Sequence, residues 1–233
     1  MGRVFSILDS KTYGVIVSSS TGLYKYENKK LIKFLPSLIN ESQNIYSIFE
    51  DSKNKLWLGG NRSLISSDGS QILYEMSILD FKNQNIRSIF ETSDTTLWIG
   101  TDKGLFRKSG ENFVLFDTLG LGKHKISSTF EDREKNLWVG TLGGGLYKIR
   151  KGKVTTLDKY NGLSDEIILP VTEGENKKIW FGSYGGGGLH RLDGKKASFF
   201  KEIFPGCVGK LSRPSGTRRR PDCFVFQYTF SNP

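Results

Sequence analysis

Two adjacent pairs of carboxylates, Glu50-Asp51 and Glu131-Asp132, are the first residues whose types could do chemistry. General acid–base catalysis uses two carboxylates whose environments push their pKa values apart. Both pairs, however, stand at the same point of a repeating pattern, after an apolar segment and ahead of a polar turn. Repetition implies like environments. We therefore interpret the pairs as turn residues, in which Asp accepts hydrogen bonds from backbone amides of the turn.

Histidine and cysteine are too few and too scattered to predict a catalytic or metal site. His124 and His190 have no Cys or His partner at ligand spacing, and no nucleophile-elbow sequence accompanies them. Cys207 and Cys223 both lie late in the chain, so the rest of it depends on no disulfide. We predict no catalytic residue, no metal and no cofactor, and hence a protein that is not an enzyme.

Glycine runs occur at positions 143–145 and 185–188, and three consecutive arginines occur at 218–220. A phosphate-binding loop needs a helix after its glycines, whereas strand-forming residues follow here, so we interpret the runs as turns between strands. Clustered arginines can neutralise phosphates. The formal charge of +10 is otherwise spread along the chain, which favours a solvated surface and terminus, and we expect no nucleic-acid partner.

A repeat of about 41 residues organises these features. Tryptophan recurs at intervals of 40 to 42 residues, in the contexts LWLGG, LWIGT, LWVGT and IWFGS, at Trp57, Trp98, Trp138 and Trp180. A Gly-Leu pair follows three of the tryptophans, beginning at Gly104, Gly145 and Gly188. A weaker copy opens the chain, with Ile16 in place of tryptophan.

Each repeat contains four short apolar or β-branched segments. In the copy at 125–158 they lie at 126–130, 137–141, 146–149 and 154–157, separated by polar or glycine-rich turns. A period of this length, without helical spacing, predicts an all-β fold in which each repeat is one four-stranded blade of a β-propeller. We assign the tryptophans to packing between blades, with an aromatic ligand platform as the alternative.

About five blades are predicted within residues 1–202, near 3–35, 44–80, 85–117, 125–158 and 166–201. The tail, residues 203–233, has no Leu-Trp or Gly-Leu-aromatic element and holds both cysteines. We hypothesise that it is an aberrant or disordered end.

The string apolar-x-Ser-Ile-x-Glu-Asp, a polar turn, Leu-Trp-Ile-Gly-Thr and Gly-Leu-aromatic resembles the two-component regulator propeller repeat. The copies from Asn44, Asn85 and Lys125 match well, and those from Val4 and Glu166 match less well. The resemblance covers about residues 3 to 200. It implies a seven-bladed periplasmic sensor region of a bacterial receptor, followed by an output module such as a histidine kinase or diguanylate cyclase.

Seven such blades need more residues than the 233 of the chain, so we expect an incomplete seven-bladed ring, with a five-bladed ring as the alternative. The sequence as given shows no signal peptide and no membrane-spanning segment. We expect membrane contact only through segments absent from it.

The leading functional hypothesis is a ligand-sensing propeller without its output domain, whose ligand the resemblance suggests to be a saccharide or other small molecule. The ligand-binding residues are not identified. The alternative is a protein–protein interaction propeller that docks a second propeller or receptor protomer. A third is a propeller lyase or quinoprotein-like enzyme.

Overall fold

The computed structural model describes residues 2–35, 44–76, 84–184, 188–194, 196–200 and 228–229. It divides into two units, Met1–Thr129 with Phe226–Pro233, and Phe130–Val225. Its regular structure is five antiparallel four-stranded sheets of consecutive strands, one of them extended by a short fifth strand, and three single-turn 3₁₀ helices. The prediction of about five four-stranded blades is confirmed. The closure of a ring stays a prediction.

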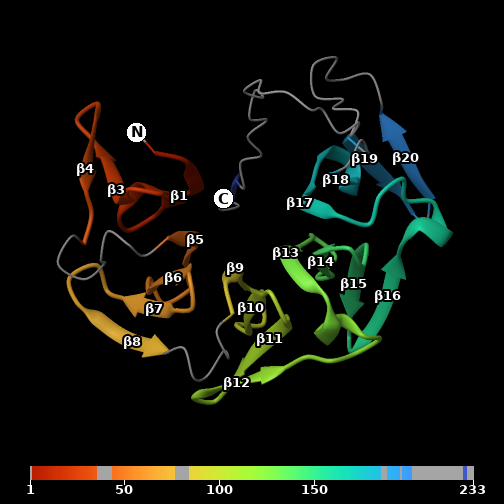
Figure 1. The fold of residues 1–233 in the computed structure, drawn as a ribbon, viewed down its shortest axis with the longest axis horizontal. Helices are drawn as coiled ribbons and strands as arrows, with labels where there is room; N and C mark the ends of the chain where they lie inside the picture. Colours follow the sequence, from red (N-terminus) through yellow and green to blue (C-terminus); the bar gives the residue numbers. More distant parts are fainter. Residues whose placement is uncertain are drawn as a thin grey trace, which may run out of the picture. The chain divides into compact units, whose positions relative to one another are not determined.

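Three blades belong to the first unit. The first contains β1 (Val4–Ser10), β2 (Gly14–Ser19), β3 (Gly22–Glu27) and β4 (Lys30–Lys33). The second contains β5 (Ile45–Glu50), β6 (Leu56–Gly60), β7 (Leu64–Ser67) and β8 (Ile72–Met76). The third contains β9 (Ile86–Glu91), β10 (Leu97–Thr101), β11 (Gly104–Ser109) and β12 (Asn112–Leu115), and the helix η1 (Leu121–Lys123) follows. In Figure 1, β1, β5 and β9 lie on the inner side of this unit and β4, β8 and β12 on its outer side.

Strands β13 (Lys125–Glu131), β14 (Leu137–Leu142), β15 (Leu146–Arg150) and β16 (Lys153–Leu157) form the fourth blade. After η2 (Lys159–Asn161), the fifth blade contains β17 (Ile168–Glu173), β18 (Ile179–Ser183), β19 (Gly188–Asp193) and β20 (Lys196–Phe200), with η3 (Glu175–Lys177) between its first two strands. The predicted tail, 203–233, lies outside the described residues except for β21 (Tyr228–Thr229). This strand pairs in parallel with Ile7 and Leu8 of β1.

Hydrophobic layers between successive blades form the core, because a single sheet cannot cover both of its faces. In the first unit, Ile16 and Leu23 of the first blade share a buried cluster with Ile45 and Leu58 of the second. Trp57 of the second blade packs in the same way against Ile86, Ile89, Leu97 and Ile99 of the third.

The second unit repeats this arrangement between its two blades. Trp138 of the fourth blade shares a buried cluster with Ile168, Val171 and Phe181 of the fifth. Trp57 and Trp138 therefore act as wedges between blades, whereas Trp180 is half-buried and contacts Phe200 of its own blade at 5.5 Å between ring centroids.

Candidate ligand-binding site

The turn between the first two strands of a blade uses the aspartate of the acidic pair as its centre. Asp51 Oδ1 accepts hydrogen bonds from the backbone amides of Lys53 and Lys55, both at 2.9 Å, and its Oδ2 accepts one from Trp57 Nε1 at 2.8 Å. In the fourth blade, Asp132 bonds the amides of the turn in the same way and holds Trp138 Nε1 at 2.7 Å. The aspartates thus fix both the turn and the indole ring.

The third and fifth blades show how this turn tolerates change. Thr92 replaces the aspartate in the third blade, and its hydroxyl lies 3.2 Å from Trp98 Nε1. Gly174 replaces it in the fifth blade. A Cβ atom on Gly174 would lie 2.6 Å from Trp180 Nε1, so the indole has moved into the space that the side chain would fill.

In three blades, the glutamate at the end of the first strand reaches back to the preceding blade. Glu50 accepts hydrogen bonds from the backbone amides of Lys11 and Thr12, at 2.8 and 3.2 Å. Glu91 does the same for Ser52 at 2.7 Å, and Glu173 for Arg133 at 3.0 Å. These glutamates therefore connect successive blades. Sequence reasoning found the role of the aspartate and missed that of the glutamate.

His190 is a core residue of the fifth blade. It is fully buried, and its ring stacks on Phe181 with a centroid distance of 4.9 Å. Its Nε2 lies 3.0 Å from the hydroxyls of both Ser164 and Ser183, and burial lowers its pKa. Among the described residues, no group bonds Nδ1, so this serine–histidine contact lacks the orienting partner of a catalytic triad. His124 follows η1 and is half-buried.

The glycines at the start of the third strand of a blade, or directly before it, have positive φ angles, which are +116° at Gly104, +79° at Gly145 and +88° at Gly188. A side chain would be strained at each. The first glycine run, positions 143–145, is a turn whose two outer amides donate to the carbonyl of Glu166 at 3.0 Å. Of the second run only Gly188 is among the described residues.

A β-bulge recurs on the first strand of several blades, and the bulged residue has no partner in the strand pairing. The strand pairing skips one residue in each of the three blades of the first unit, at Phe5, Tyr46 and Arg87. The neighbouring serines remain buried, whereas these three residues are half-buried. Bulges re-aim side chains and are over-represented next to active sites.

Phe5, Tyr46 and Arg87 lie side by side, and we call them the bulge row. The rings of Phe5 and Tyr46 meet edge to face with centroids 5.2 Å apart, and the guanidinium carbon of Arg87 lies 5.9 Å from the Tyr46 centroid. Asp102 holds Arg87 through Nε at 2.6 Å and receives a second bond from Asn85 Nδ2 at 2.7 Å. The row therefore combines two aromatic rings with a positioned charge pair.

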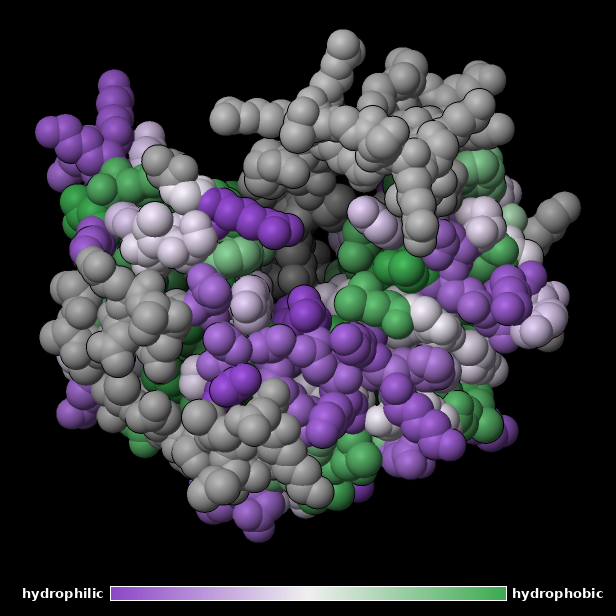
Figure 2. All heavy atoms as spheres, in the orientation of Figure 1, coloured by the Kyte–Doolittle hydropathy of each residue, from purple (hydrophilic) through white to green (hydrophobic). Residues whose placement is uncertain are grey.

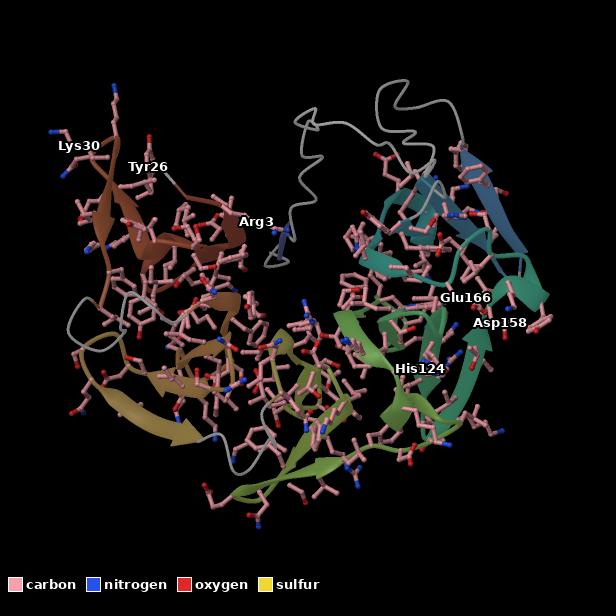
Figure 3. All side chains as sticks on the ribbon, in the orientation of Figure 1. Arg3, Tyr26, Lys30, His124, Asp158 and Glu166 are labelled. Atoms are coloured by element: carbon pink, nitrogen blue, oxygen red, sulfur yellow. The ribbon has the colours of Figure 1, made fainter. Side chains whose placement is uncertain are left out.

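Arg3 extends the bulge row at its first-blade end. Its guanidinium carbon lies 5.9 Å from the Phe5 centroid, and the residue is exposed. Figure 3 shows Arg3 at the inner edge of the first blade, on the side opposite Tyr26 and Lys30. On the face shown in Figure 2, hydrophilic residues gather over the third blade, where β9 and β10 lie in Figure 1.

The sequence carried one signal for the bulge row. In the repeated string apolar-x-Ser, the middle position is Phe5, Tyr46 and Arg87 in successive copies, while its neighbours hardly change. A position that varies within an otherwise constant repeat is typical of residues that determine binding specificity. Of the residues that are the same in most copies, Trp57, Trp98 and Trp138 are instead buried, and the glycines have positive φ angles.

Comparison with known proteins agrees with this architecture. The family model described as "Two component regulator propeller" matches residues 41–62, 80–103 and 120–143. This chain carries two-component regulator propeller repeats. The three matches fall in the second, third and fourth blades of the propeller, the copies whose Leu-Trp and Ser-x-Phe-Glu elements are most complete. No curated protein sequence matches the propeller.

Solved structures share the propeller fold at low sequence identity. The extracellular domain of a hybrid two-component system from B. thetaiotaomicron is 21% identical, with a TM-score of 0.72 over 89% of this chain and 30% of that one. Virginiamycin B lyase from Staphylococcus aureus is 15% identical, with a TM-score of 0.71 over 88% and 72% of the two chains. The GH74 enzyme of Niastella koreensis is 16% identical, with a TM-score of 0.64 over 85% and 37%. The propeller thus spans under a third of the first of these chains.

Within the part of the chain that the structure describes, no three His, Cys, Asp or Glu side chains gather to hold a metal ion. No helix in that part is long and apolar enough to cross a membrane.

Proposed function

We propose that this chain is the ligand-sensing propeller region of a bacterial signal-transduction receptor, and that the bulge row binds the ligand. The observation that carries the proposal is the bulge itself, which places a different, partly exposed side chain at one fixed position in each of three successive blades. Rigid strands that present variable side chains are a common way to build specificity onto a repeated scaffold.

Two similarities to known proteins support the signalling role in this proposal. The repeat is that of two-component regulator propellers, and one structural neighbour is the extracellular domain of a hybrid two-component system. An extracytoplasmic location, periplasmic or at the cell surface, belongs to the same proposal. A ligand that binds one receptor state better than another shifts the balance between the states, without a large change within the propeller.

The proposal assigns no catalytic step to this chain. The lyase and the glycoside hydrolase share its fold, and a fold hosts many activities. The ring of His190, which contacts the hydroxyls of Ser164 and Ser183, is buried in the fifth blade.

Tyr46 and Tyr26 provide a matched test. Calorimetry of the full chain against an oligosaccharide panel should find a ligand whose affinity falls about tenfold or more in Tyr46→Ala, because a buried aromatic at a binding centre contributes about 2 kcal/mol. Tyr26→Ala should bind normally, since Tyr26 is 50% exposed on the outer part of the first blade. Equal losses in the two variants, or no binding by well-folded protein, would contradict the proposal.

A further inference from the structure

We propose that the edge of β1 that faces away from β2 is a peptide-binding site. We call it the β1 edge. It adds an uncharged, aromatic-rich segment in extended conformation as a parallel strand, and its occupant in this protein is a segment of the protein's own tail. The site does not depend on the ligand of the bulge row.

The pairing of β21 with β1 is the observation that carries the proposal. Tyr228 is in register with Ile7 and Thr229 with Leu8, and the two strands run parallel. Both strands belong to the first unit, and Figure 1 shows β21 as a short dark-blue strand on the inner side of that unit. Every other described strand pairs only with its neighbours in chain order. No short loop joins β21 to β1, so the pairing reflects a match between the two strands.

The β1 edge provides what an added strand needs. Because β2 pairs with one side of β1, the other side presents backbone amides and carbonyls that a further strand can satisfy. Along β1, Phe5 and Ile7 are half-buried, whereas Ser6 and Leu8 are buried. An occupant therefore gains backbone hydrogen bonds and lies beside two apolar residues that the first blade leaves partly exposed.

The tail segment 224–230, with the sequence FVFQYTF, has the composition of such an occupant. Phe, Val, Tyr and Thr favour strands, and the segment contains no charged residue, no proline and no glycine, whereas residues 203–223 contain all three. Its aromatic residues alternate, at positions 224, 226, 228 and 230, so in a strand they share one face. The register of Tyr228 with Ile7 assigns this face to the half-buried side of β1. The segment and the edge are therefore matched in polarity.

Hydrogen exchange of the full chain, followed by mass spectrometry, tests the pairing. Proline has no backbone N–H and is excluded from the interior of a sheet, so Tyr228→Pro and Thr229→Pro each disrupt the added strand. In at least one of them, we expect amides of β1 to exchange about tenfold or more faster than in the unchanged chain, because one lost hydrogen bond changes local stability by about that factor. Ser231→Pro, the same change beyond the segment, should leave the exchange of β1 unaltered.

A synthetic peptide tests whether the edge is a binding site. The segment FVFQYTF flanked by two lysines at each end, added to the faster-exchanging variant, should restore the protection of β1, and the same peptide with proline in place of its tyrosine should not. Unchanged exchange in both proline variants, or an increase that spreads equally to β9–β12, would overturn the proposal, as would a peptide that restores nothing. Protection that weakens on dilution of the unchanged chain would assign the strand to a second copy and overturn its origin in the same chain.

Discussion

Asp132 offers the sharpest test of how a blade is held together. Its carboxylate accepts hydrogen bonds from the backbone amides of Glu134 and Asn136, from the Asn136 side chain through both oxygens, and from Trp138 Nε1, at 2.7 to 2.9 Å. Asp132 and Asn136 are buried, with exposed fractions of 6% and 0%. Asp132→Ala removes every one of these acceptors at once.

The expected cost follows from the donors that remain. The amide of Glu134 can turn to water, but the donors of Asn136 and the indole of Trp138 are enclosed. Each buried donor left without an acceptor costs about 1 to 3 kcal/mol, so Asp132→Ala should lower the free energy of unfolding by about 3 to 5 kcal/mol. Asp132→Asn should lower the free energy of unfolding nearly as much. The asparagine side chain has an NH₂ group in place of one acceptor oxygen, and this group would face N–H donors that the carboxylate accepts from.

Urea denaturation followed by circular dichroism measures this difference. Asp9→Ala is the matched control, because Asp9 is an exposed aspartate on β1 and should change stability by less than about 0.5 kcal/mol. A loss below about 1 kcal/mol in Asp132→Ala, or an unchanged Asp132→Asn, would refute the view that the carboxylate organises the turn and anchors the tryptophan.

Three further changes probe contacts between and within blades. Glu50→Gln should lower the free energy of unfolding by about 1 to 2 kcal/mol in urea, because an amide cannot accept all the hydrogen bonds from the first blade; unchanged stability would contradict the inter-blade role. Gly100→Ala should lower the free energy of unfolding by about 1 to 3 kcal/mol, because its Cβ would lie 2.6 Å from a methyl carbon of Ile126. Gly182→Ala is the control and should lower it clearly less, because the nearest atom to its Cβ lies at 3.4 Å. Burial lowers the pKa of His190 below its ordinary value of 6.5, so the unfolded chain takes up a proton at a higher pH than the folded chain does. The stability contributed by neutral His190 should therefore be lost as pH falls through and below 6.5. The urea midpoint should therefore be lower at pH 5.5 than at pH 7.5, and His190→Phe should make this difference smaller. A difference that persists unchanged in His190→Phe would show that other groups cause it.

The blades could be read from the sequence because their determinants are local. A tryptophan, an acidic pair and a Gly-Leu pair at fixed spacing specify strands and turns within a single repeat, and the turn at Asp51 has the hydrogen bonds expected of it. The same reasoning assigned the neighbouring Glu50 to the turn and missed its contact with the preceding blade. Glu50 bonds a segment about 40 residues earlier in the chain, and no pattern within one repeat indicates that partner.

The candidate site is where local patterns end and tertiary structure decides. Phe5, Tyr46 and Arg87 are one repeat apart in sequence, and the repeated string apolar-x-Ser shows only that they occupy the same position of each copy. Stacking of the blades brings them into contact, and the bulge turns each out of its ladder. By itself the sequence determined the blade, since strand and turn preferences act between near neighbours. Only the packed structure determined which side chains of different blades meet, because that depends on strand register and on how one sheet lies against the next.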